Sequence, residues 1–204
     1  MRDGLVVASG GNLSAREPRS NRIWITAAGS WLDRLDEGAL LSVNIDDGTP
    51  VDGCGVKDSH PGARPSTELA LHLATYRARP DVNAVIHLHP QMAILLDALG
   101  QRIQLVTTDH RAYLRAIAHT PFYPPGSTEL AAAAGAAVAD GINCVLLAHH
   151  GCSVLGPDLD MAYRRAVNLG EAAHLTYQAL LLTGGLPGRS IEECPPLPSD
   201  VESV

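Results

Sequence analysis

The chain has 204 residues, of which 46% are hydrophobic and 18% charged, a composition typical of one globular domain with a buried core. Its formal net charge of −7 provides no broad basic surface for DNA or RNA phosphates, which excludes a general nucleic-acid partner. The sequence has no apolar run of about 18 residues and no charged-then-apolar leader, so we expect a cytoplasmic protein without a membrane partner.

The first part of the chain alternates loop signals with strand-like segments. Residues 9–16, SGGNLSAR, have the character of a loop followed by a short polar stretch. Residues 21–29 predict a strand that runs into a glycine turn, and residues 40–53 predict a strand, an Asp-Gly turn and an edge element. Residues 65–80 begin with capping residues and end at a proline, as expected of an amphipathic helix.

Longer helices surround two apolar strands in the rest of the chain. We expect strands at 83–90 and 143–151, and helices at 91–99, 126–140 and 157–185. Because these elements do not alternate in regular βαβ order, the sequence predicts an α/β fold of three layers, α/β/α, with a mixed, largely antiparallel central sheet. One domain is expected over 1–185, followed by a proline-rich tail over 186–204.

The pentapeptide STELA occurs twice, at 66–70 and at 127–131, each time at an expected helix start. A serine at such a position can accept a hydrogen bond from a free backbone N–H of the first turn. Shared capping chemistry therefore explains the repetition better than an internal duplication does.

Lysine and cysteine usage limits the available chemistry. Lys57 is the only lysine, and it lies in a glycine- and aspartate-rich turn, DGCGVKDSHPG. A Schiff-base enzyme needs a desolvated lysine, so lysine-based covalent catalysis is not expected. The cysteines fit neither a C-x-x-C motif nor a small disulfide scaffold, and we expect reduced thiols at Cys54, Cys144, Cys152 and Cys194.

The stretch VIHLHP (85–90) places two histidines, two positions apart, in an apolar strand. Alternate side chains of a strand share a face, so His87 and His89 point the same way and can converge on one ion. A second apolar run ends at His149 and His150, at the end of another expected strand. Because adjacent strand residues face opposite ways, only one of the two can face His87 and His89. Three histidines with an open position form a catalytic zinc site. The other histidines are more typical of surface or packing positions: His60, His72, His110, His119 and His174.

Three short segments are suited to a small anion such as a phosphate. They are SGGNLSAR with its backbone and side-chain amides, the glycine turn TAAG (26–29), and PSTEL (65–69) with two hydroxyls at a helix N-terminus. Each motif alone is more often only structural. Glu68 lies in the last of these segments, and a carboxylate near a metal can serve as a general base.

Five motifs occur together in the order and spacing of the class II aldolase/adducin family, which this sequence resembles over residues 4–184. They are GGNLSAR (10–16), ITAAG (25–29), PSTE (65–68), HLH (87–89) and HHG (149–151). The resemblance implies that His87, His89 and His150 hold one Zn²⁺ per subunit, or another divalent metal, and that Glu68 is the catalytic acid–base residue. It also implies that the substrate phosphate is held by Gly11, Asn12, Ala28, Gly29, Ser66 and Thr67.

The resemblance implies a lyase that cleaves a ketose 1-phosphate, such as L-fuculose 1-phosphate, to dihydroxyacetone phosphate and an aldehyde. The reaction would pass through a metal-stabilised ene-diolate. The implied partner is a phosphorylated sugar, and the implied assembly is a homotetramer with active sites at subunit interfaces.

Two departures from the family pattern leave other activities open. Ala28 stands where the aldolases usually have a hydroxyl residue, and no tyrosine of 105–119 aligns clearly with their proton donor, for which Tyr113 and His110 are substitutes. Decarboxylases of oxo-acid phosphates share the zinc site and the glutamate, and a dehydratase of a ribulose 1-phosphate is a further alternative. A non-catalytic, adducin-like interaction domain is the alternative from another class.

Overall fold

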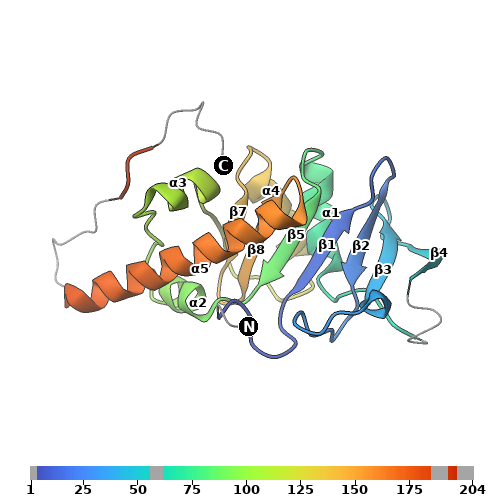
Figure 1. The fold of residues 1–204 in the computed structure, drawn as a ribbon, viewed down its shortest axis with the longest axis horizontal. Helices are drawn as coiled ribbons and strands as arrows, with labels where there is room; N and C mark the ends of the chain where they lie inside the picture. Colours follow the sequence, from blue (N-terminus) through green and yellow to red (C-terminus); the bar gives the residue numbers. More distant parts are fainter. Residues whose placement is uncertain (1–3, 56–61, 185–192, 197–204) are drawn as a thin grey trace.

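A computed structural model describes residues 4–55, 62–184 and 193–196. In this part of the chain the strands form one eight-stranded sheet with the order β4-β3-β2-β1-β5-β8-β7-β6 (Figure 1). Neighbouring strands are antiparallel except for β6 and β7, which are parallel. The strands are β1 (Asn12–Arg16), β2 (Arg22–Thr26), β3 (Leu40–Asn44), β4 (Pro50–Gly55), β5 (Ala84–Leu88), β6 (Ala118–Thr120), β7 (Cys144–Leu147) and β8 (Gly151–Gly156).

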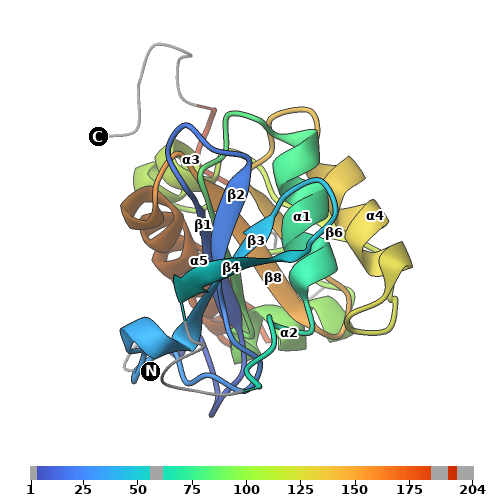
Figure 2. The ribbon, with the colours of Figure 1, turned by 90° about the vertical axis from the view of Figure 1, so that its right-hand side faces the viewer.

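Helices cover both faces of this sheet (Figure 2). On one face, α1 (Leu69–Ala78) packs against α4 (Thr128–Val138). On the other face, α5 (Leu159–Leu182) crosses β5 and β8 and packs against α2 (Gln91–Ala98) and α3 (Thr108–Leu114). A short 3-10 helix, η1 (Glu37–Ala39), precedes β3. The predicted α/β/α arrangement with a largely antiparallel sheet is confirmed.

The sheet separates two apolar cores, and strand alternation sorts the side chains between them. Along β5, Ile86 and Leu88 belong to the core under α5, whereas Val85 belongs to the core under α1 and α4. His87 has the same parity as Val85 and therefore faces α1. Among the described helices, none combines the length and the apolar character that a membrane span requires.

The segment 12–16 differs most from its expected structure. Expected as a polar stretch after a loop, it forms β1 in the middle of the sheet, paired with both β2 and β5. Its inward side chains, Asn12 and Ser14, are polar yet 7% and 0% exposed. Hydrogen bonds to α1 engage Asn12 Oδ1 and the Ser14 hydroxyl, so the strand is buried without the apolar alternation that predicts a strand.

Four further elements were missed: η1, α3, β6 and β8. The strand β8 begins directly after His149 and His150, and a glycine lies at each of its ends. In the sequence, the glycine after the two histidines indicated only a turn. The helix α3 has only seven residues, and Thr107 caps it by accepting a hydrogen bond from the backbone N–H of His110. Such short elements depend on tertiary packing more than on their own pattern.

Part of the predicted tail lies against the body of the protein. Of residues 186–204 the structure describes 193–196, where the Cys194 N–H donates to the Leu105 carbonyl and Glu193 pairs with Arg111 at 2.8 Å. As expected, Cys144, Cys152 and Cys194 are free thiols. Lys57, His60 and the side chain of Cys54 lie outside the described part of the structure.

Candidate metal centre

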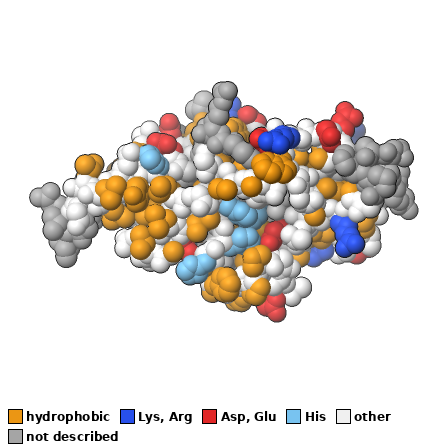
Figure 3. Space-filling model, turned by 90° about the horizontal axis from the view of Figure 1, so that it is seen from below, with side chains coloured by type: hydrophobic (Ala, Val, Ile, Leu, Met, Phe, Trp, Pro, Cys, Tyr) orange, Lys and Arg blue, Asp and Glu red, His pale blue; other side chains and the backbone are white. Residues whose placement is uncertain are grey.

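Three histidine side chains meet at one end of the sheet. His87 belongs to β5, His89 follows it, and His150 lies in the turn between β7 and β8. The Nε2 atoms of His87 and His89 are 3.0 Å apart, and one ligand nitrogen from each ring lies within 4.8 Å of the others. Tetrahedral zinc with Zn–N distances of about 2.0–2.1 Å needs nitrogens about 3.3 Å apart, so this cluster fits one divalent cation. Figure 3 shows histidine side chains gathered near the middle of one face of the molecule.

The neighbouring histidine, His149, turns away from the cluster. Its backbone is in the left-handed region with φ 58°, its N–H donates to Asp97 Oδ2 at 3.0 Å, and its ring contacts Phe122. The His150 N–H instead donates back to the Leu147 carbonyl at 3.0 Å. The expectation that only one of the pair joins the others is confirmed, although a tight turn rather than strand alternation separates the two side chains.

Burial favours the neutral form of the three imidazoles. It lowers the pKa of His87 well below the ordinary value, helped by the nearby His89 and His150. It also lowers the pKa of His89, and it lowers the pKa of His150 to about 4. Neutral imidazole is the form that binds a metal ion, so the cluster is ready to bind a cation at neutral pH.

Two glycines flank the ring of His89. A Cβ on Gly10 would lie 2.8 Å from His89 Nδ1, and a Cβ on Gly151 would lie 2.7 Å from His89 Cδ2 and would overlap the Leu88 carbonyl oxygen. Neither position has room for a side chain while His89 keeps its place. Gly10 and Gly151 therefore leave the space that the His89 ring occupies.

Glu68 lies beside the histidines, at the N-terminal end of α1. It is 5% exposed, and its Oε1 is 3.9 Å from His150 Nε2. Its Oε2 is buried without a hydrogen-bond partner among the described residues. Burial raises the pKa of this carboxyl group, and a backbone hydrogen bond from Gly126 opposes the rise. A buried carboxylate next to a cation site is suited to acid–base chemistry.

The candidate phosphate-binding segments lie next to one another and to the histidines. The Ala28 N–H donates to the Arg64 carbonyl at 2.9 Å, and the Ser66 N–H donates to the Thr26 carbonyl at 3.0 Å, which brings the turn 27–29 beside 64–67. Asn12 pairs with His87 in the register of β1 and β5. These contacts place the amide of Asn12 close to the metal centre.

Ser66 and Thr67 precede the helix instead of starting it, since α1 begins at Leu69. The Ser66 hydroxyl accepts a hydrogen bond from the Glu68 N–H at 3.2 Å, within a turn ahead of the helix. In the second STELA segment, the Ser127 hydroxyl accepts from the Leu130 N–H at 3.1 Å and caps α4. The expectation that both copies cap helices alike is therefore wrong for the first copy.

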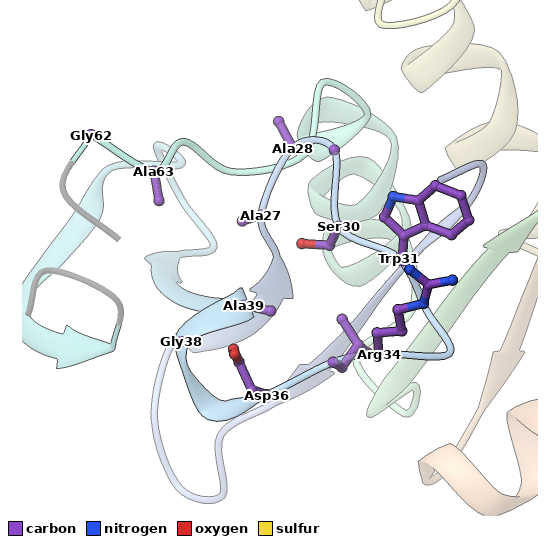
Figure 4. A pocket seen from close by; sticks show the side chains of 12 residues that line it. Ala27, Ala28, Ser30, Trp31, Arg34, Asp36, Gly38, Ala39, Gly62 and Ala63 are labelled. Carbon is purple, nitrogen blue, oxygen red and sulfur yellow. The ribbon is translucent and has the colours of Figure 1, made fainter. Parts of the chain in front are cut away.

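A cavity of about 440 Å³ opens beside the glycine turn (Figure 4). Ala28 and Gly29 line it together with Trp31 and Arg34, and the guanidinium carbon of Arg34 lies 4.7 Å from the centre of the Trp31 ring. The other candidate phosphate residues do not line it: Gly11, Asn12, Ser66 and Thr67. The cavity therefore meets the candidate phosphate site only at the turn.

The two candidate proton donors lie elsewhere in the chain. Tyr113 and His110 belong to α3, which packs against α5 on the face of the sheet opposite α1. The His110 side chain is buried, with 2% of its surface exposed. The Tyr113 side chain forms a hydrogen bond with Arg164, and this bond is the main cause of the raised pKa of Arg164. Within one chain, α3 places neither side chain on the face that holds Glu68.

A buried polar network under the site was missed because His72 was expected to be a surface or packing residue. His72 is 0% exposed, and its Nε2 lies 2.6 Å from Asn12 Oδ1 while its Nδ1 lies 2.6 Å from the Ser14 hydroxyl. Tyr76, four residues further along α1, continues the network to Ser14 at 2.9 Å. The spacing of Glu68, His72 and Tyr76, four residues apart on one helix face, is the signal that could have indicated it.

Neutral histidines around one cation position, with a buried carboxylate beside them, match the kinds of ligand and general base that catalytic metal centres use. The fold and the site thus define a metal-dependent α/β enzyme. The family model described as the Class II Aldolase and Adducin N-terminal domain matches residues 1–177. The chain belongs to the class II aldolase and adducin family, and it is a metal-dependent lyase of the aldolase type.

Named relatives agree with this family. The chain is 34% identical over 177 residues to the L-fuculose phosphate aldolase of Methanocaldococcus jannaschii, covering 87% of this chain and 89% of the relative. It is 30% identical over 179 residues to the 3-oxo-tetronate 4-phosphate decarboxylase of Haemophilus influenzae, covering 85% and 80%. The solved structure of L-fuculose-1-phosphate aldolase from Thermus thermophilus superposes with a TM-score of 0.73 at 26% identity, covering 91% of each chain.

Proposed function

We propose that the protein is a zinc-dependent aldolase that cleaves a ketose 1-phosphate, such as L-fuculose 1-phosphate, to dihydroxyacetone phosphate and an aldehyde. The observation that carries the proposal is the buried Glu68 carboxylate, 3.9 Å from a nitrogen of the histidine cluster and with one oxygen unpartnered. Similarity to aldolases that act on fuculose phosphate supports this substrate class.

In this proposal His87, His89 and His150 hold the metal ion. A bound divalent cation supplies positive charge that stabilises the negative charge developing on the substrate oxygens. Glu68 removes a proton from the carbon next to the carbonyl of dihydroxyacetone phosphate during condensation, and it returns that proton during cleavage. Its surroundings raise the pKa of its carboxyl group and so make the carboxylate a stronger base than an exposed glutamate.

The phosphate would be held by the Asn12 side-chain amide, the backbone at Gly11 and Gly29, and the hydroxyls of Ser66 and Thr67. Ala28 brings no hydroxyl, and its N–H is already donated to the Arg64 carbonyl. We therefore assign the backbone contact of this turn to Gly29, whose N–H has no hydrogen-bond acceptor among the described residues. In a homotetramer, a proton donor would come from a neighbouring subunit, for which Tyr113 and His110 remain the candidates. Size-exclusion chromatography with light scattering tests the assembly.

Proton exchange of dihydroxyacetone phosphate in deuterated water, followed by NMR, tests the proposal without knowledge of the aldehyde. We expect exchange with zinc, loss of exchange with a chelator, and at least a 100-fold slower rate in Glu68→Gln. Glu129→Gln is the matched control, because Glu129 occupies the same place in the second STELA segment but is exposed. A folded, zinc-loaded protein that catalyses no exchange would overturn the aldolase proposal.

Decarboxylation of an oxo-acid phosphate is the second candidate function. It is supported by the similarity to 3-oxo-tetronate 4-phosphate decarboxylases over 85% of this chain. The two reactions differ in whether the departing fragment is an aldehyde or carbon dioxide. Release of carbon dioxide from 3-oxo-tetronate 4-phosphate, together with no exchange on dihydroxyacetone phosphate, would establish the decarboxylase instead.

A further inference from the structure

A line of buried polar side chains connects α1 to the candidate phosphate site. Glu68, His72 and Tyr76 lie four residues apart and share one helix face, from which His72 and Tyr76 form hydrogen bonds with β1. On β1, the inward side chains opposite this face are Asn12 and Ser14. The helix thus presents one residue to the metal centre and the next two to the strand that carries the candidate phosphate amide.

The donors and acceptors in this line can be assigned in one consistent direction. Burial lowers the pKa of His72 to about 3, so its imidazole is neutral and carries one proton. Because the amide oxygen of Asn12 faces His72 Nε2 at 2.6 Å, that nitrogen donates. Nδ1 must then accept, and the Ser14 hydroxyl 2.6 Å away donates to it. The Tyr76 hydroxyl ends the line: it lies 2.9 Å from the Ser14 hydroxyl and donates to the Ser14 carbonyl at 3.1 Å.

The donation from His72 stabilises this orientation of the Asn12 amide. With Oδ1 held by His72, the Nδ2 group must point away from the helix. In the described residues no hydrogen bond engages Nδ2, and it is not among the buried atoms that lack a partner. Asn12 is paired with His87 across the strands, so these two free N–H donors lie next to the metal centre.

We propose that His72 is a positioning residue that holds the Asn12 amide with its two N–H donors turned toward the substrate phosphate. The inference rests on the proposed function, since it takes the phosphate of a sugar phosphate as the anion that Asn12 meets. The reversed amide would present its oxygen to the anion, which would repel it. His72 therefore favours phosphorylated substrates without touching them.

Two substitutions of similar size separate the two hydrogen bonds of His72. In His72→Gln the side-chain amide reaches the position of Nε2 and can still donate to Asn12. In His72→Asn the shorter amide reaches only the position of Nδ1, next to Ser14. The zinc-loaded full chain is titrated calorimetrically with dihydroxyacetone phosphate, with inorganic phosphate and with unphosphorylated dihydroxyacetone, and zinc affinity is measured for each variant.

We expect His72→Asn to weaken binding of both phosphate compounds about tenfold, and His72→Gln to stay within about threefold of the original protein. Zinc affinity and dihydroxyacetone binding should change by less than twofold in both. In an Asn12→Ala background, His72→Asn should cause no further loss, because the group it orients is gone. Equal losses in both variants, or additive losses in the double variant, would mean that His72 acts only through general stability.

The same data separate this inference from the proposed function. If Asn12→Ala weakens phosphate binding but His72→Asn does not, the phosphate site stands and the positioning role of His72 is overturned. If Asn12→Ala leaves phosphate binding unchanged, the proposed phosphate site itself fails, and the role of His72 fails with it.

Discussion

Replacing Gly151 by alanine should displace His89 and weaken zinc binding. The new Cβ would lie 2.7 Å from His89 Cδ2, whereas ordinary contacts of this kind begin at 3.4 Å, so the ring or the turn must shift by about 0.7 Å. Metal–ligand distances tolerate only about ±0.2 Å. We therefore expect a loss of zinc affinity of about 10–100-fold, similar to the loss of a supporting group around a metal site. Overpacking against the Leu88 carbonyl should also cost about 1–3 kcal/mol of unfolding free energy.

Competition with a chromogenic chelator measures the zinc affinity, and urea unfolding in the presence of EDTA measures the stability of the metal-free protein. Gly170→Ala on α5 is the control, because its Cβ would meet only the end of the flexible Leu5 side chain at 3.0 Å. That variant should bind zinc within twofold of the original protein. Unchanged zinc affinity in a folded Gly151→Ala protein would refute the argument that His89 needs the space beside this glycine.

Three further predictions concern stability. Free zinc at about 100 times its Kd should raise the free energy of unfolding by about 2.7 kcal/mol, which calorimetry should show as a rise in Tm of about 5–10 °C, and EDTA should reverse this rise. His150→Ala should lose this response and His174→Ala, at an exposed position of α5, should keep it; an equal rise in both would show a different zinc site. His72 has a folded pKa of about 3 and an unfolded value near 6.5, so it costs no stability above pH 6.5 and progressively more as the pH falls toward 3. Urea unfolding in EDTA should show that the free energy of unfolding falls between pH 7.5 and pH 5.0 by about 2 kcal/mol less in His72→Gln than in the original protein. An equal fall in both proteins would contradict burial of a neutral imidazole. Ser127→Ala should lower the unfolding free energy by about 1 kcal/mol through loss of the α4 cap, with phosphate binding unchanged, whereas Ser66→Ala should weaken phosphate binding. The reverse pattern would contradict the different roles of the two serines.

The sequence predicted those features that depend on local periodicity. His87 and His89 share a face because alternation along one strand is a local property, and the structure brings their Nε2 atoms within 3.0 Å. The choice of His150 over His149 came from the family resemblance, because the turn that turns His149 away cannot be inferred from alternation. The long helices at 126–140 and 157–185 were found to within a few residues, as α4 and α5.

The strand side of the polar interior, unlike the spacing of its helix residues, could not be predicted, because it depends on partners distant in sequence. Asn12 and Ser14 resemble loop residues until α1 supplies the hydrogen bonds that allow their burial. His72 resembles an ordinary packing residue until β1 lies beside it. Satisfaction of buried polar groups is a tertiary property, so sequence periodicity contained no signal for a polar strand at the centre of the sheet.

The central position of β1 has a consequence for the order of folding. This strand alone joins the β2–β4 ribbon to the strands β5–β8, and its register pairs Asn12 with His87, more than 70 positions later. During synthesis one edge of β1 therefore stays unpaired until β5 has emerged, which is a contact of high sequence separation and a slow one to form. When that contact forms, Asn12 comes to lie beside His87 in the same step. Joining the two parts of the sheet and placing Asn12 beside His87 are thus one event, and His150 joins the candidate site only after β7 and β8 have followed.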